Sequence, residues 1–114
     1  SLYIATQTRS TDFPVTAEAY DTSYNGEYDI CISLLSADLS TLNSSTYLGG
    51  SSDETFAKLS LAADGSLYVA GLTYSSDFPV TSDAFRISSI PAFISHLTAN
   101  LNLLSHSTFF NAAA

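Results

Sequence analysis

Short runs of alternating or β-branched residues, separated by turn-forming residues, follow one another along the whole chain. Such runs predict β-strands, and they cover residues 1–7, 29–36, 42–49, 55–62, 66–73, 92–98 and 101–110. The alternation is clearest in the run TFAKLSLA. Asp64-Gly65 favours a tight hairpin directly after it, and Ala99-Asn100 predicts a turn before the last run.

The second half of the chain repeats the first. Residues 1–20 align with residues 66–85 at an offset of 65, with twelve identical positions, and residues 29–47 align with residues 91–109 at an offset of 62. The offset falls by three because the segment DTSYNGEY is shortened to RISSI, and surface loops tolerate such changes of length. The chain therefore holds one whole repeat unit and most of another.

Repeated units of four short antiparallel strands predict an all-β fold made of β-propeller blades. Residues 1–50 are expected to form an incomplete blade with strands two to four, and residues 51–110 a complete blade, while residues 111–114 are a tail that reads as a possible cloning scar. A blade buries its faces only against its neighbours, and closed propellers need about four to eight blades. We therefore expect contacts with other blades, in a longer parent chain or by self-association through open edges.

The phrase DFPVT occurs once in each unit, between its second and third strands, and each of its residues is expected to have a structural role. Pro14 restricts the backbone so that Phe13 is held as a plug between blades. Asp12 is expected to accept bonds from nearby backbone N–H groups, and Thr16 to cap the short turn that follows. The same roles fall in the second unit to Asp77, Phe78, Pro79 and Thr81.

The charge balance is strongly acidic, because eleven acidic residues accompany only three cations, and the net charge is −8. Three cations cannot form the basic surface that binds nucleic acid or an anionic membrane. No apolar run is long enough to cross a bilayer as a helix, so no membrane insertion is expected. Cys31 is the only cysteine, which rules out a disulfide within the chain, and we expect it to be a small buried residue.

Three motifs, STYLGG, DGSLYVAG and SDFPVT, follow one another between Ser45 and Thr81. Together they resemble the SBBP repeats, a bacterial family of β-propeller repeats, and the resemblance extends over nearly the whole chain. It adds Gly49, Gly50 and Gly65 to the signature positions of the repeat. The segment STFFNA at 107–112 departs from the pattern, because it lacks both glycines of STYLGG.

The resemblance implies a repeat scaffold of a secreted or cell-surface bacterial protein, with no generally assigned catalytic activity. We therefore expect a structural scaffold, or a surface that binds protein or carbohydrate. One alternative stays open: a propeller-borne hydrolase or lyase whose active site is assembled from several blades. This chain would then supply only part of the site.

Few side chains indicate chemistry of their own, and no cofactor is expected. Asp53, Glu54 and Asp64 form a weak Ca²⁺ candidate, but the chain has no DxDxDG loop, and solvation of turns and edges is the simpler interpretation. Asp53 and Glu54 are also a poor pair for glycoside hydrolysis, because neighbours on a strand point to opposite faces.

Two groups of aromatic side chains remain. His96 and His106 are predicted to be cross-strand neighbours, but zinc requires two further ligands, so they read as ordinary histidines of a sheet face. Tyr20, Tyr24 and Tyr28 lie in the longer loop of the first unit. They either recognise a ligand or cover blade edges.

Overall fold

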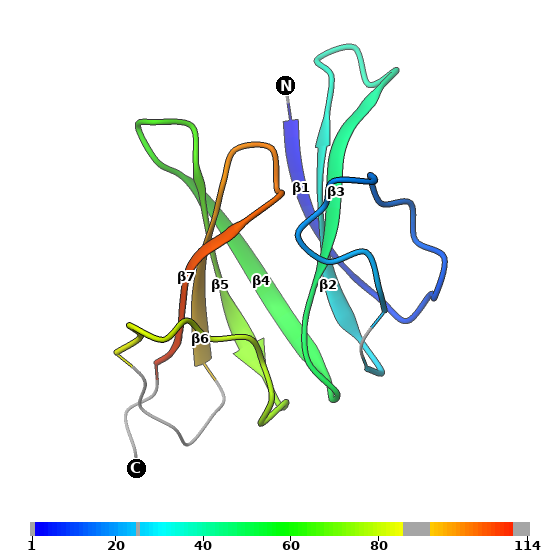
Figure 1. The fold of residues 1–114 in the computed structure, drawn as a ribbon. Coiled ribbons are helices and arrows are strands. Elements are labelled where there is room, and N and C mark those ends of the chain that lie inside the picture. Colours follow the sequence, from blue (N-terminus) through cyan, green and yellow to red (C-terminus); the bar gives the residue numbers. More distant parts are fainter. Residues whose placement is uncertain (1, 25, 86–91, 111–114) are drawn as a thin grey trace.

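The computed structural model describes residues 2–24, 26–85 and 92–110, without the side chain of Phe56. In these ranges the chain is all-β, with two antiparallel sheets and no helix (Figure 1). The N-terminal sheet has the order β1 (Leu2–Thr8), β2 (Asp29–Leu35), β3 (Leu42–Leu48). The C-terminal sheet has the order β4 (Glu54–Leu61), β5 (Leu67–Thr73), β6 (Ala92–Leu97), β7 (Leu104–Phe109).

Each of the seven strands lies within or beside a run that the sequence pattern predicts. The largest difference concerns the last strand, which was expected from residue 101 and begins at Leu104. Leu101 instead closes the preceding turn with a φ of 62°, and its N–H donates to the Thr98 carbonyl (2.9 Å). The shortened segment at 86–90 and the tail at 111–114 lie outside the described residues.

The sequence repeat is also a repeat of contacts. Strands β1, β2 and β3 correspond to β5, β6 and β7, and β4 has no counterpart in the N-terminal sheet. Ser33 and Ser45 share a buried hydroxyl–hydroxyl bond of 2.8 Å, and their counterparts Ser95 and Ser107 share one of the same length. The two units therefore have the same internal geometry as well as similar sequences.

The core lies between the two sheets, and the sheets contribute opposite faces to it. The N-terminal sheet contributes Ile30, Ile32 and Leu48. The C-terminal sheet and its turns contribute Leu67, Val69, Phe78, Phe93, Leu97, Leu101 and Phe109. Strand β4 contacts both β1 and β2 at this junction. We call the two faces that meet in the core the inner faces and the two opposite faces the outer faces.

The inner faces are not equivalent in the repeat. Side chains alternate between the faces of a strand, so Ile32 and its counterpart Ile94 mark the same face of their respective units. Ile32 is on an inner face with 0% of its surface exposed, whereas Ile94 is on an outer face with 39% exposed. The two units therefore pack front to back, which leaves one copy of each contact face without a neighbouring sheet.

Candidate functional site

The threonines of the two DFPVT phrases bind the outermost strand of their own sheet. The Thr16 hydroxyl accepts the Ser45 N–H (3.1 Å), and the Thr81 hydroxyl accepts the Ser107 N–H (3.1 Å). The turn after Thr16 is closed by its carbonyl, which accepts the Ala19 N–H (3.1 Å). The expected capping by the Thr16 side chain is therefore wrong, because the hydroxyl fastens the loop to β3 instead.

The phenylalanines of the two phrases differ in burial. Phe78 belongs to the core, and its ring centroid lies 4.2 Å from that of Phe93. Phe13 is half-buried and lies 6.4 Å from the ring of Tyr47. Phe78 thus packs on the rings of its own sheet inside the core, while Phe13 covers a face of the N-terminal sheet that has no neighbouring sheet; the role of a plug between blades stays a prediction.

The aspartates of the two phrases accept bonds from different donors. The Asp77 carboxylate accepts the Ser51 N–H at 2.9 Å, although Ser51 lies 26 residues away in the connection before β4. The Asp12 carboxylate accepts the Ser10 hydroxyl. A backbone donor therefore reaches Asp77 as expected, but it comes from a distant segment and not from a local turn.

The glycine pair Gly49-Gly50 lies where carboxylates approach the backbone. A Cβ atom on Gly49 would lie 2.4 Å from Glu54 Oε1 and 2.6 Å from Asp29 Oδ1. A Cβ atom on Gly50 would lie 2.5 Å from Asp77 Oδ1. Real Cβ atoms do not approach other atoms so closely, so a larger residue at either position would have to displace these carboxylates.

Glu54 and Asp29 bring two fully buried carboxylates to the junction of the sheets. Glu54 accepts the Gly50 N–H (3.2 Å), the Thr73 hydroxyl (2.8 Å) and the Ser75 hydroxyl. Burial, together with the negative charge of Asp29 and against the effect of these donors, raises the pKa of Glu54 to about 7. Asp29 was not singled out in the sequence, because a residue 25 positions from Glu54 gives no local signal of the pair.

The weak Ca²⁺ candidate is not brought together by the fold. Glu54 begins β4, whereas Asp64 lies in the hairpin beyond the other end of that strand and binds Ser66. Asp53 accepts the Tyr28 N–H (2.9 Å). In the part of the chain that the structure describes, no three acidic, histidine or cysteine side chains group as metal ligands do.

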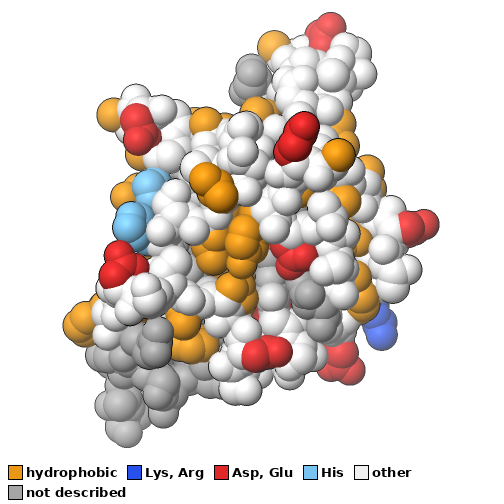
Figure 2. Space-filling model, in the orientation of Figure 1, with side chains coloured by type: hydrophobic (Ala, Val, Ile, Leu, Met, Phe, Trp, Pro, Cys, Tyr) orange, Lys and Arg blue, Asp and Glu red, His pale blue; other side chains and the backbone are white. Residues whose placement is uncertain are grey.

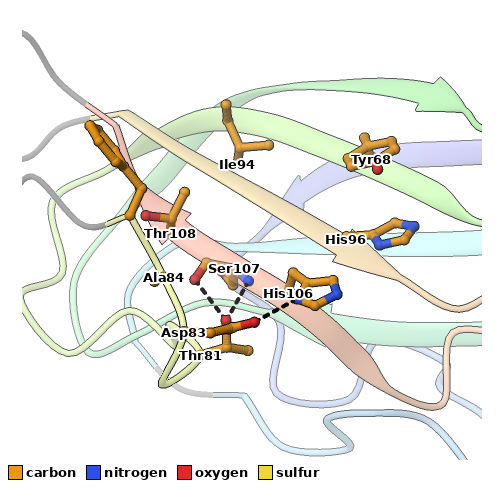
Figure 3. A pocket seen from close by; sticks show the side chains of 10 residues that line it. Tyr68, Thr81, Asp83, Ala84, Ile94, His96, His106, Ser107 and Thr108 are labelled. Atoms are coloured by element: carbon orange, nitrogen blue, oxygen red, sulfur yellow. Dashed lines mark hydrogen bonds and ion pairs between the residues drawn. The ribbon is translucent and has the colours of Figure 1, made fainter.

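A shallow cavity of about 190 Å³ lies on the outer face of the C-terminal sheet (Figure 3). Its walls include a row of parallel rings, with 4.3 Å between the centroids of Tyr68 and His96 and 5.9 Å between those of His96 and His106. The two histidines are cross-strand partners, as predicted, and Figure 2 shows them side by side at the surface. His106 Nδ1 lies 3.3 Å from Asp83 Oδ2, and Ile94 and Phe85 extend the apolar part of this face.

The remaining candidates contact their own chain. Cys31 is buried, and burial together with Asp29 and Asp21 raises the pKa of its thiol to about 12. The Tyr24 ring lies 6.3 Å from that of Tyr47, and the Arg9 guanidinium lies 5.0 Å from the Tyr28 ring centroid.

Comparison with known proteins adds no relative: no protein-family model, no curated protein and no solved structure matches the chain. The described residues also include no helix long and apolar enough to cross a membrane. The outer face of the C-terminal sheet is therefore interpreted from its own geometry and from the corresponding face of the N-terminal sheet.

Proposed function

We propose that the chain is a non-catalytic repeat module made of one incomplete and one complete β-propeller-type blade, and that it acts as a scaffold with an exposed sheet face for interactions. The observation that carries the proposal is the front-to-back packing of the two units. The face that is buried at the joint in one unit is exposed in the other unit. Further units could therefore be added in the same way, which suits a radial or linear array.

The titratable groups support a structural role. Glu54 and Asp29 are buried at the joint of the sheets, where Glu54 is held by three donors from the connections around β4 and β5. A catalytic carboxylate must reach a substrate, whereas these two face the backbone of Gly49. The resemblance of the repeat motifs to SBBP repeats favours a secreted or cell-surface bacterial protein as the setting.

The exposed ring row and apolar side chains favour a protein partner. Tyr68 and Ile94 are large exposed apolar groups on one face, with Phe85 beside them. In the other unit the counterparts of Tyr68 and Ile94 are Tyr3 and Ile32. Ile32 belongs to the core between the sheets, and Tyr3 packs against that core. A face of this kind is built to be covered by another sheet.

The packing can be tested by a disulfide between the units. The Tyr20 N–H of the first unit donates to the Leu101 carbonyl of the second (2.8 Å), so the two backbones are in direct contact at the joint. The double variant Y20C/L101C should form this disulfide within one chain under mild oxidation, as seen by a gel shift and by loss of two free thiols. Retention of both thiols in the folded variant would contradict the front-to-back packing.

A further inference from the structure

The tips of two hairpins adopt the same unusual conformation. Leu39 and Leu101 occupy the same repeat position, with φ values of 63° and 62°. Each N–H donates over 2.9 Å to the carbonyl three residues earlier, that of Ser36 or Thr98. A leucine at positive φ is uncommon, because its Cβ crowds the following carbonyl oxygen. The chain therefore presents a leucine at this tip in both units.

The surroundings of the two leucines are opposite. Leu101 has 0% of its surface exposed, because the tip of its hairpin packs against the first unit. Its carbonyl accepts the Tyr20 N–H, and the carbonyl of Ala99 in the same hairpin accepts the hydroxyl of Tyr3. Leu39 has 61% of its surface exposed, on the β2–β3 hairpin that projects beyond the N-terminal sheet in Figure 1.

The receiving surface is also repeated. Tyr3 and Tyr20, which hold the Leu101 hairpin, correspond to Tyr68 and Phe85 in the second unit. Phe85 has 66% of its surface exposed, and Tyr68 is exposed beside Ile94. One chain thus carries an uncovered leucine tip at one end and an uncovered receiving face at the other.

From this we propose that the outer face of the C-terminal sheet binds the outer face of the N-terminal sheet of a second copy. Leu39 of the second copy inserts against Phe85, whose N–H donates to the Leu39 carbonyl, and the Tyr68 hydroxyl donates to the Ala37 carbonyl. The inference rests on the proposed function, since it takes the internal joint as the pattern for the joint between copies. The contact is head-to-tail, so it closes a ring or continues as a filament.

The joint between copies is expected to be weaker than the internal one. Strand β4, which contacts β1 and β2 at the internal joint, has no counterpart in the N-terminal sheet. His96 also stands on the receiving face where the first unit has Leu34. On the opposite side of the joint, Leu2 and Ile4 are the exposed counterparts of the buried Leu67 and Val69. The outer face of the N-terminal sheet therefore offers an apolar surface that can pack against Ile94.

Cysteine cross-linking detects such a joint even when association is weak. A mixture of L39C and F85C proteins should form the mixed disulfide several-fold in excess over both homodisulfides under mild oxidation. L103C mixed with F85C is the matched control, because Leu103 is also 61% exposed and lies in a hairpin that is already docked. Cys31 is buried and does not compete in the folded protein.

The internal disulfide of Y20C/L101C separates the two proposals. If the internal bond forms but L39C links to F85C no better than L103C does, the joint between copies is refuted and the module stands. If the internal bond also fails in a folded variant, both the proposed module and the joint between copies are refuted.

As a second readout, sedimentation should show association of the wild-type chain that L39N abolishes. Asparagine tolerates positive φ, so the fold is retained. A wild-type chain that stays monomeric at all concentrations would also overturn the inference.

Discussion

Glu54 offers the sharpest test of the buried joint, through the substitution E54Q. The carboxyl is fully buried and keeps Asp29 as a buried neighbour of like charge. Glutamine preserves the shape and an acceptor for the Gly50 N–H, and the hydroxyls of Thr73 and Ser75 can reorient. The substitution therefore removes the titration and little of the packing.

The magnitude follows from the pKa of Glu54, which is raised from 4.5 to about 7 by burial first and by Asp29 second. Because the folded chain holds the proton more tightly than the unfolded chain, the resulting stability is fully present below pH 4.5 and is lost as pH rises through 7. A shift of this size corresponds to about 3 kcal/mol in the free energy of unfolding, at about 1.4 kcal/mol per pH unit.

The assay is urea denaturation followed by circular dichroism at a series of pH values from about 4.5 to above 7. The difference between wild type and E54Q reports Glu54 together with its interaction with Asp29, since the other titratable groups are common to both proteins. Wild type should lose about 3 kcal/mol relative to E54Q across this range. The control E18Q changes an exposed glutamate and should follow wild type. Parallel pH profiles for wild type and E54Q would refute the reasoning.

Two further predictions concern positions next to this joint. G49A should destabilise the fold by more than about 2 kcal/mol, because its Cβ would lie 2.4 Å from Glu54 Oε1 and 2.6 Å from Asp29 Oδ1. Chemical denaturation measures this loss. A change below about 0.5 kcal/mol would contradict the close approach. Cys31, with a thiol pKa raised to about 12 by burial, should resist a thiol reagent at pH 8 in the folded chain and react at once in urea. Fast labelling of the folded chain would contradict the burial of this thiol.

The strands could be predicted because alternation and turn residues are local signals. The repeat then predicted which strands correspond, since a second copy of the same phrase meets the same packing problem. The cross-strand pairing of His96 and His106 followed from the same reasoning. These features depend on residues close to one another or on a comparison within the chain.

Other features depend on contacts between distant segments, which the sequence pattern does not encode. Leu101 reads as the start of an apolar strand run, yet it packs as a tip against the first unit. The Thr16 hydroxyl binds Ser45, 29 residues away, and not the turn that follows it. The pair of Glu54 and Asp29 also arises only when the first residues of β4 and β2 meet beside Gly49.

The central claim, that the two units pack front to back, is tested most directly by a matched pair of substitutions, I32A and I94A. Both replace isoleucine at the same repeat position, but Ile32 is buried between the sheets and Ile94 is exposed. Denaturation in dilute solution should show a loss of about 2–5 kcal/mol for I32A and a much smaller change, of about 0.5 kcal/mol, for I94A. Equal losses for the two variants would contradict the packing.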